Sequence, residues 1–267
     1  MQTGKGVSLF LNSRQARGLS HQTIRWYKGI LYNFARQYPK LPKSPEQIEE
    51  FIASCPAGDE RKHGYYRAIR ALYRFLKRRA HISRNPMERV DPPKRKIKYP
   101  KICTPDELDQ LLSYPHRPEI KTALLFLIDT GARVGELTNL KIRDISETPW
   151  GYVARISGKT GTRLVPISNE TYNTLVKYLP FGYTAYRLRR LISRAFKDAH
   201  IQGSALKLRH TFATLWEGDE LVLQKIMGHA HLSTTMIYRH LRTKVISTQH
   251  REYSPLRMVY SRSKSML

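Results

Sequence analysis

The spacing of apolar residues in the first 90 positions predicts four helices. A short helix covers Ser8 to Arg17, and Gly18-Leu19-Ser20 ends it and caps a second helix. Along this second helix the apolar residues share one face: Ile24, Tyr27, Leu31, Phe34 and Tyr38. Ser44-Pro45-Glu46-Gln47 begins a third helix. We therefore expect a helical N-terminal region.

The fourth predicted helix, from about Glu60 to Arg79, has two chemically distinct faces. Tyr65, Ile69, Leu72 and Leu76 repeat at helical spacing and would face a core. The opposite face carries only cations: Arg67, Arg70, Arg74, Lys77 and Arg78. A charged face is often just solvated, but a soluble helix usually interleaves glutamates among its cations. The pattern favours contact with DNA over plain solvation.

A basic linker follows, and a new domain begins after it. Several prolines between Asn85 and Pro100 disfavour regular structure, and Lys94, Arg95 and Lys96 add positive charge that suits a phosphate backbone. Thr104-Pro105-Asp106-Glu107 then combines a cap, a proline and acidic residues, as a helix start does. We assign residues 1–90 to one domain, which the cations of the fourth helix mark as DNA-binding, 91–101 to the linker and 102–267 to a second domain.

The second domain reads as helices interrupted by a small sheet. Short alternating segments predict strands at Ile142–Ile145, Tyr152–Ser157 and Arg163–Ile167. Helices are predicted at Glu119–Asp129, Arg133–Leu140, Asn169–Leu179, Thr184–His200, Leu206–Trp216 and Glu220–Met227, and again from Ser233 or Thr234. Lys159 lies at the turn between the last two strands, where spacing alone predicts a solvated lysine, although the flanking glycines and Arg163 also suit a hairpin that reaches a duplex.

The charge of the chain makes a polyanion the expected partner. Its 267 residues include 47 Lys and Arg against 21 Asp and Glu, a net charge of +26, and 40% hydrophobic residues, which excludes a disordered basic tail. Nucleic acid is the first candidate, but charge alone does not separate a scaffold from an enzyme. No apolar run approaches a membrane span, and the two cysteines are too few for a disulfide framework. We expect a cytoplasmic, nucleoid-associated protein.

Candidate chemistry gathers in four segments of the second domain. Arg133 falls at a helix start, where backbone N–H groups favour anions, although it could instead pair with Glu136. Arg209 stands beside a face of small apolar residues and could point into a site. His229 follows a glycine stop, and Tyr238 is either ordinary surface or a nucleophile toward a phosphodiester. No nucleotide loop or paired acidic metal site appears, so no cofactor is expected.

Together these segments resemble the tyrosine recombinase (phage integrase) family. They are Thr130-Gly131-Ala132-Arg133-Val134-Gly135-Glu136-Leu137, Gly158-Lys159-Thr160, Leu208-Arg209-His210-Thr211-Phe212-Ala213-Thr214, and Gly228-His229 followed by Thr234-Thr235-Met236-Ile237-Tyr238-Arg239-His240. Each segment alone is a weak match, but four in the family's order make a specific one. The resemblance implies a mainly α fold with a small antiparallel sheet, and a helical core-binding domain that closes with the catalytic domain as a C-shaped clamp around DNA.

The resemblance also implies roles for individual residues. Tyr238 would join covalently to a 3′ phosphate, Arg133 and Arg209 would hold its non-bridging oxygens, Lys159 would protonate the leaving oxygen, and His229 would hydrogen-bond the phosphate. No metal or ATP would be needed. The implied partners are double-stranded DNA, further copies in a tetramer on two DNA sites with the C-terminal tail docked in trans, and accessory proteins as further candidates. Arg67, Arg70, Arg74, Lys77, Lys94, Arg95, Lys96 and Arg163 are the predicted DNA contacts.

One position departs from the family pattern. The family commonly has His or Lys three residues before the second arginine, where this chain has Leu206. Leucine cannot transfer a proton, so strand transfer would either survive at a reduced rate or rely on Lys207 or His210. Three functions follow from these features: an active site-specific recombinase, which we favour; a DNA-binding homologue with weakened cleavage; and a relaxase like the type IB topoisomerases.

Overall fold

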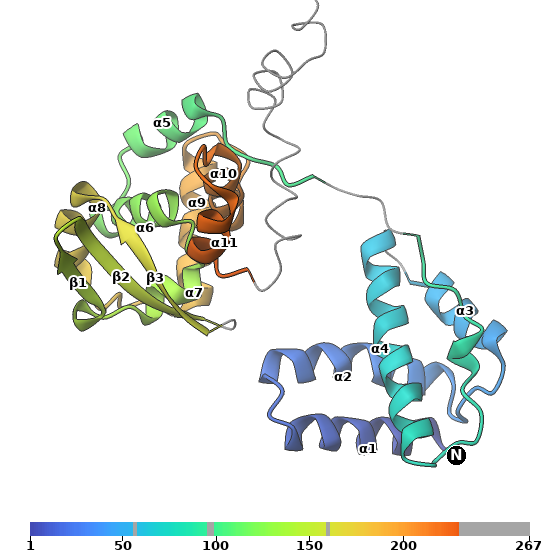
Figure 1. Cartoon of the computed structure of the whole chain (residues 1–267). Coiled ribbons are helices and arrows are strands. Elements are labelled where there is room, and N and C mark those ends of the chain that lie inside the picture. The colour runs from blue at the N-terminus through green and yellow to red at the C-terminus, as the bar shows by residue number, and fades with distance from the viewer. Residues whose placement is uncertain (56–57, 95–98, 159–160, 230–267) are drawn as a thin grey trace, which may run out of the picture. The chain divides into compact units, whose positions relative to one another are not determined.

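The structure is a computed structural model that describes residues 1–55, 58–94, 99–158 and 161–229 (Figure 1). The chain divides into two compact units, Met1–Lys98 and Tyr99–Leu267. The junction at Lys98 falls inside the predicted linker, residues 91–101. That linker and the separate DNA-binding role of the first unit stay predictions.

The first unit is built from four helices and one short 3₁₀ turn. The helices are α1 Thr3–Ala16, α2 His21–Gln37, α3 Pro45–Ala53 and α4 Asp59–Arg78, and the turn is η1 Pro86–Glu88. Ser20 caps α2 as predicted, because its side chain accepts a hydrogen bond from the Thr23 amide. Helix α1 begins at Thr3 instead of Ser8, since Val7 is fully buried and draws the preceding turn into the core.

The segment after Asn85 is more regular than its prolines suggested. Asn85 accepts a hydrogen bond from the Met87 amide at 3.1 Å and so caps η1. Met87 is buried in the core of the first unit. Proline suits this place, because the first position of a helical turn needs no N–H donor. Residues 86–88 therefore belong to the first unit and not to an irregular connection.

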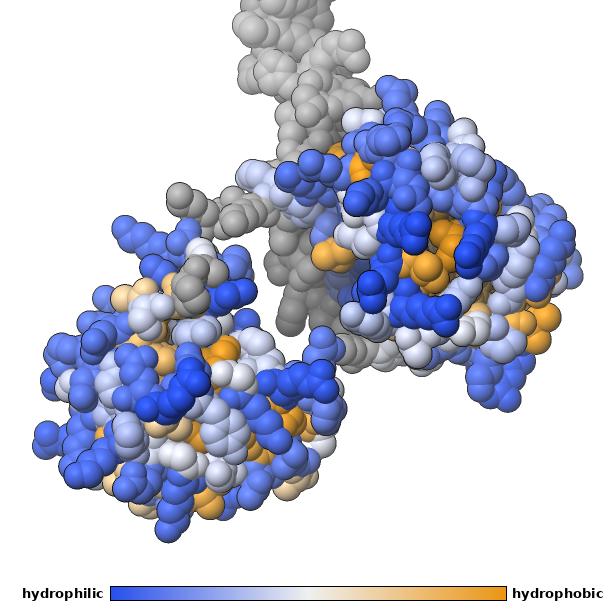
Figure 2. Space-filling model, turned by 180° about the vertical axis from the view of Figure 1, so that it is seen from behind, coloured by the Kyte–Doolittle hydropathy of each residue, from blue (hydrophilic) through white to orange (hydrophobic). Residues whose placement is uncertain are grey.

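Aromatic rings fill the core of the first unit. Phe34, Phe51 and Tyr73 are fully buried, and the Phe34 and Phe51 rings meet edge to face at 4.9 Å. The apolar face of α4 is wider than predicted and includes Tyr66 and Phe75. The surface differs from this aromatic core, because hydrophilic residues cover most of the face of both units that Figure 2 shows.

The second unit packs seven helices and two 3₁₀ turns with one sheet in its described part. The helices are α5 Pro105–Ser113, α6 Pro118–Thr130, α7 Val134–Asn139, α8 Asn169–Leu175, α9 Ala185–Asp198, α10 Ala205–Leu215 and α11 Glu220–Met227, and the turns are η2 Ile142–Asp144 and η3 Val176–Tyr178. The predicted helix start before α5 is present as a full capping box between Thr104 and Glu107. The buried helix α6 contacts α8, α10 and strand β3, which makes it the centre of this unit (Figure 1).

The sheet is antiparallel and has the order β1-β2-β3, with β1 Ile145–Thr148, β2 Gly151–Gly158 and β3 Gly161–Ile167. The register of β2 and β3 runs from Tyr152 opposite Ile167 to Gly158 opposite Gly161. The prediction of a strand at Ile142–Ile145 was wrong, because the Asp144 carboxylate accepts a hydrogen bond from the Lys141 amide and holds residues 142–144 in a turn. The predicted mainly α fold with a small antiparallel sheet is confirmed.

Among the helices that the structure describes, none is long and apolar enough to cross a membrane.

Candidate active site

Arg133, Arg209 and His229 come from three different elements and gather at one end of α6. Gly131 ends α6 in the left-handed conformation at φ 61°, which turns the chain so that Arg133 caps α7. A Cβ at Gly131 would lie 2.5 Å from the Phe212 ring of α10, so only glycine fits. This close packing brings the Arg133 turn next to the helix that carries Arg209.

Arg209 is buried, and main-chain oxygens fix its guanidinium. One terminal nitrogen donates to the Gly131 carbonyl at 2.6 Å, and the other donates to the Met227 carbonyl at 2.7 Å. The side chain is only 4% exposed. These bonds tie α10 to the C-terminal ends of α6 and α11, so the orientation of Arg209 is set before any ligand arrives.

His229 follows the αL glycine that ends α11 and lies against Arg209. Its Nε2 is 3.2 Å from a terminal nitrogen of Arg209. A guanidinium can only donate, so Nε2 accepts and the imidazole proton sits on Nδ1. Burial lowers the pKa of His229 to about 4, and the nearby charges of Arg209, Arg133 and Arg163 act in the same direction. The imidazole is therefore neutral at pH 7.

A buried glutamate joins Arg133 to the sheet. Glu136 is 2% exposed and accepts from the Arg133 guanidinium at 3.0 Å and from the Arg133 amide at 2.7 Å. It also accepts two bonds from Arg163 on β3, at 2.8 and 2.9 Å. Pairing with Glu136, which the sequence left open, is thus present. It leaves the Arg133 side chain 39% exposed, enough to reach a ligand.

Arg163, a predicted DNA contact, is bound within the Glu136 network. Its side chain is 10% exposed, both terminal nitrogens bond Glu136, and Nε donates to the Ile226 carbonyl at 2.6 Å. These bonds link β3 to α7 and α11, and a DNA contact of Arg163 stays a prediction. Sequence reasoning missed this link, because the signal was a single acidic residue, Glu136, between the apolar positions Val134 and Leu137.

The low pKa values of Glu136 and His229 predict that acidification lowers the free energy of unfolding in two separate pH ranges. Burial alone would raise the pKa of Glu136, but the bonds from Arg163 and Arg133 outweigh it and lower that pKa to about 2. The stability that Glu136 contributes is present above its usual pKa of 4.5 and is lost as pH falls toward 2. His229 acts in another window, because unfolded histidine binds a proton below its usual pKa of 6.5 and the folded one does so near 4.

We therefore expect the free energy of unfolding to fall between pH 6.5 and 4 in part because of His229. In His229→Gln that decline is shallower, since glutamine does not titrate. Urea denaturation at several pH values in this window measures the difference. Parallel curves for the parent and the variant would contradict the assigned environment of His229.

The structure separates the two residues that could substitute for the group missing at Leu206. Leu206 is 60% exposed. Lys207 turns toward α5, where its ammonium donates to the Glu107 carboxylate at 2.9 Å and to the Gln202 carbonyl at 2.9 Å. His210 is half-buried, and burial together with the charge of Arg209 lowers its pKa. His210 also contributes to the low pKa of His229, so it lies nearer the cluster and is the better candidate.

Two predicted catalytic residues, Lys159 and Tyr238, and the helix expected from Ser233 or Thr234 lie outside the described residues. Gly158 and Gly161, which flank residues 159 and 160 in the chain, are described as partners in the sheet. A Cβ at Gly158 would lie 2.5 Å from a carboxylate oxygen of Glu136. The base of this hairpin thus packs directly on the Glu136 network.

The predicted DNA contacts of the first unit lie on its surface. Arg67, Arg70, Arg74, Lys77 and Lys94 are exposed, while Arg95 and Lys96 lie outside the described residues. The Arg67 guanidinium stacks over Trp26 at 5.9 Å and that of Arg70 over Tyr66 at 5.8 Å. Lys77 differs from them, because its ammonium is paired with Glu88 at 2.8 Å.

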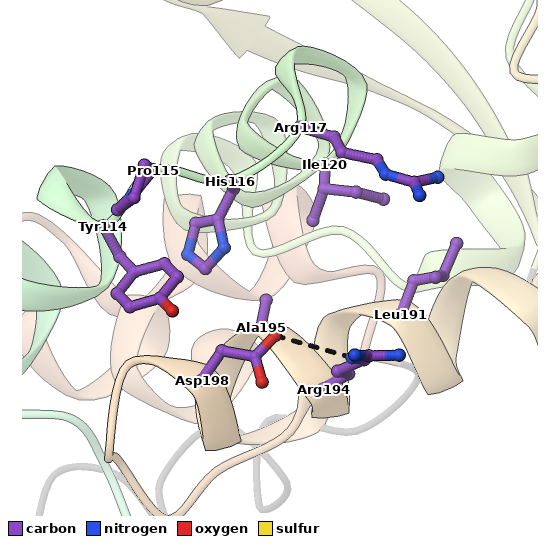
Figure 3. Close-up of a pocket in the computed structure, with 9 residues that line it drawn as sticks. All are labelled: Tyr114, Pro115, His116, Arg117, Ile120, Leu191, Arg194, Ala195 and Asp198. Atoms are coloured by element: carbon purple, nitrogen blue, oxygen red, sulfur yellow. Dashed lines mark ion pairs between the residues drawn. The ribbon is translucent and has the colours of Figure 1, made fainter.

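Two hollows mark the surface of the second unit. One of about 420 Å³ opens beside the cluster and is lined by Gly161, Thr162, Arg163, Leu221, Gln224, Lys225, Gly228 and His229. The other, of about 270 Å³, lies between the α5–α6 connection and α9 (Figure 3). It contains the exposed pair Arg194 and Asp198 at 3.6 Å and no predicted catalytic residue. The candidate site is therefore the region around His229.

Comparison with known proteins gives the class of this chain. The phage integrase family matches residues 101–244. The chain is 30% identical to the tyrosine recombinase XerD of Rickettsia bellii, over 89% of this chain and 94% of that protein. It is 30% identical to the tyrosine recombinase XerA of Pyrococcus horikoshii, with 88% of each covered. It is 36% identical to the tyrosine recombinase XerC of Pelobacter propionicus, over 65% of this chain and 66% of that protein.

Solved structures share the fold. The recombinase XerH bound to palindromic difH substrate in a post-cleavage complex has a TM-score of 0.73 at 21% identity, covering 90% of this chain and 82% of that one. A lambda integrase(75-356) dimer bound to a COC′ core site has a TM-score of 0.76 at 17% identity, covering 90% and 95%. Fold and relatives define a site-specific DNA strand transferase. The chain belongs to the tyrosine recombinase (phage integrase) family, and the resemblance seen in the sequence is confirmed.

Proposed function

We propose that this recombinase cuts and rejoins duplex DNA through a 3′-phosphotyrosyl intermediate on Tyr238, without a metal or ATP. The observation that supports this most is the buried guanidinium of Arg209, fixed by the Gly131 and Met227 carbonyls beside His229. Arg133 is close enough for its charge to lower the pKa of His229. Two guanidinium groups and a neutral imidazole at one point suit a phosphodiester whose equatorial oxygens gain charge as it reacts.

In the proposed reaction the phenol oxygen of Tyr238 attacks phosphorus and gives its proton to a water molecule. The bond from phosphorus to the 5′ oxygen breaks, and Lys159 gives that oxygen a proton. Arg133 and Arg209 hold the non-bridging oxygens, and His229 hydrogen-bonds one of them. Rejoining runs in reverse, with a 5′ hydroxyl as the attacking group and the phenol as the leaving group. The number of phosphodiester bonds is conserved, so no external energy source is required.

We further propose that the chain works as a tetramer on two DNA sites. A lambda integrase tetramer bound to a Holliday junction shares the fold at a TM-score of 0.75 and 18% identity, which supports this assembly. The C-terminal tail would dock on a neighbouring copy, and the exposed cations Arg67, Arg70, Arg74 and Lys94 would contact the DNA backbone. Accessory proteins and action at the nucleoid stay part of the proposal.

A nicked duplex that carries the target site tests the chemistry. Cleavage next to the nick releases a short fragment, so the covalent protein–DNA adduct accumulates and is visible on a denaturing gel. We expect an adduct with the parent and none with Tyr238→Phe, which keeps the ring and removes the nucleophile. Absence of an adduct from the parent, on DNA that it binds, would favour the competing function of a DNA-binding homologue with weakened cleavage, which Leu206 suggests.

Leu206→His is expected to raise the rate of adduct formation. Position 206 is exposed one turn before Arg209, so an imidazole there could transfer protons without repacking the core. A missing general acid or base costs roughly 10²- to 10⁴-fold in rate, and the gain lies within that range if His210 does not already supply the group. Single-turnover cleavage by the parent, Leu206→His and Leu206→Gln measures it. Equal rates in all three would refute the idea that Leu206 limits catalysis.

A further inference from the structure

Four arginines meet where α1 and α4 of the first unit pack together. Arg14 and Arg17 come from the end of α1, and Arg74 and Arg78 come from the last turns of α4. With Ala71 and Phe75 they line a hollow of about 240 Å³. No acidic residue lines it, and in the described part of the chain none of the four is ion-paired with a carboxylate. We call this group the arginine pocket.

Arg14 is held in place although its charge is not compensated. Its guanidinium carbon lies 4.5 Å from the centroid of the Phe10 ring, and Phe10 packs edge to face on Phe75 at 5.7 Å. The Nε of Arg14 is buried and has no hydrogen-bond partner among the described residues. Burial lowers the pKa of Arg14, Tyr27 acts in the opposite direction, and Arg17 and Arg78 lower the pKa further by charge repulsion.

Such an arrangement is costly without a ligand. Like charges repel, and a buried N–H without an acceptor has lost its water and gained nothing. One bound anion would relieve both costs, because it would accept hydrogen bonds from several guanidinium groups at once. The planar guanidinium of arginine can donate two parallel hydrogen bonds to the oxygens of one phosphate, which the ammonium of lysine cannot do. The pocket contains arginines and no lysine.

We propose that the arginine pocket is a seat for one backbone phosphate of bound duplex DNA. The inference rests on the proposed function only in naming DNA as the source of the phosphate. Arg74 and Arg78 belong to the cationic face predicted for α4. Arg14 and Arg17 come from α1, and with them part of that face becomes a defined site. Lys77, which is paired with Glu88, is not part of it.

The salt dependence of DNA binding by the full-length chain tests the seat. Each phosphate contact contributes about 0.9 to the slope of log K against log salt concentration. We expect Arg17→Gln, which changes an exposed arginine of the pocket that is not among the other proposed DNA contacts, to reduce the slope on a mixed-sequence duplex by up to that amount. Arg36→Gln is the matched control, because it removes one exposed charge from α2 outside the pocket and should leave the slope unchanged. Equal slopes for Arg17→Gln and the parent would overturn the proposal.

Thermal unfolding gives a second readout that needs no DNA. At low ionic strength Arg74→Gln should melt at a higher temperature than the parent, because it relieves repulsion in the pocket. Inorganic phosphate should raise the Tm of the parent more than chloride at equal ionic strength, and this difference should shrink in Arg74→Gln but not in Arg36→Gln. Arg14→Gln should show the same two effects on Tm. Arg74 is exposed, so Arg74→Gln can be made without disturbing the core of the first unit.

The outcomes separate this inference from the proposed function. A phosphate effect on Tm without a change in the DNA slope would show a free-anion site and overturn DNA as the source. Loss of self-assembly in sedimentation, with an unchanged slope, would show that the pocket holds acidic residues of a second copy and would also overturn it. A trapped Tyr238 adduct with an unchanged slope would refute only the phosphate seat. A reduced slope without any adduct would refute only the cleavage chemistry.

Discussion

Arg209→Lys is expected to slow single-turnover DNA cleavage by roughly 10²- to 10³-fold, the usual effect of removing one donor to a developing oxyanion. The guanidinium of Arg209 reaches the Gly131 and Met227 carbonyls with two different nitrogens and His229 with one of them. A lysine ammonium is a single point and cannot hold these partners while it faces a phosphate. Rapid-quench kinetics on a nicked duplex measures the loss.

A neutral substrate distinguishes charge stabilisation from misfolding. In a methylphosphonate duplex one non-bridging oxygen at the cleaved position is replaced by a methyl group, so less negative charge develops there. If Arg209 stabilises that charge, Arg209→Lys should be much less impaired on the methylphosphonate than on the phosphate. An equal loss on both substrates would mean that the variant disturbs the fold of the site, and the assigned role would fail.

Glu136→Gln is expected to lower the free energy of unfolding of the second unit by roughly 3 to 5 kcal/mol, the usual cost of leaving a buried charge unpaired. Glu136 is 2% exposed and is the carboxylate that both Arg133 and Arg163 bind. Glutamine keeps the shape but removes the charge, so Arg163 would stay buried without its partner. Urea unfolding followed by circular dichroism at pH 7 measures the change.

Glu107→Gln is the matched control for this prediction. Glu107 pairs with Lys207 at 2.9 Å but is 34% exposed, and Lys207 also donates to the Gln202 carbonyl, so loss of the Glu107 charge should cost less than loss of the Glu136 charge. Glutamine also preserves the capping box at the start of α5. A similar loss of stability in the two variants would contradict the view that the ion pairs of Glu136 contribute more to stability than the ion pair of Glu107 with Lys207. Cleavage should fall in Glu136→Gln alone, because Arg133 loses the group that orients it.

Local signals in the sequence predicted most of the fold. The capping box at Thr104, the cap at Ser20 and the glycine stop before His229 depend on residues within one turn, so the local sequence is enough to predict them. Errors arose where spacing was ambiguous. The apolar residues Ile142 and Ile145 are three positions apart, which fits a turn as well as a strand. The Asp144 carboxylate accepts a hydrogen bond from the Lys141 amide and so stabilises the turn.

Contacts between distant segments were beyond local patterns. Arg163 was predicted as a DNA contact, and its bonds to Glu136, 27 residues earlier in the chain, were not predicted. The arginine pocket likewise combines Arg14 with Arg74, which nothing in either helix alone indicates. Family resemblance placed Arg209 and His229 in one site, and the structure adds the carbonyl groups that fix them. The assignments of Lys159 and Tyr238 stay predictions.

The most direct test of the central claim is a structure of the Tyr238→Phe variant bound to duplex DNA containing its target site. We expect one phosphate whose non-bridging oxygens lie within hydrogen-bond distance of Arg133 and Arg209, with His229 on the same phosphate and the ring of residue 238 in line with its 5′ oxygen. A complex in which Arg133 and Arg209 contact different phosphates, or in which no copy brings residue 238 to the one they share, would contradict it.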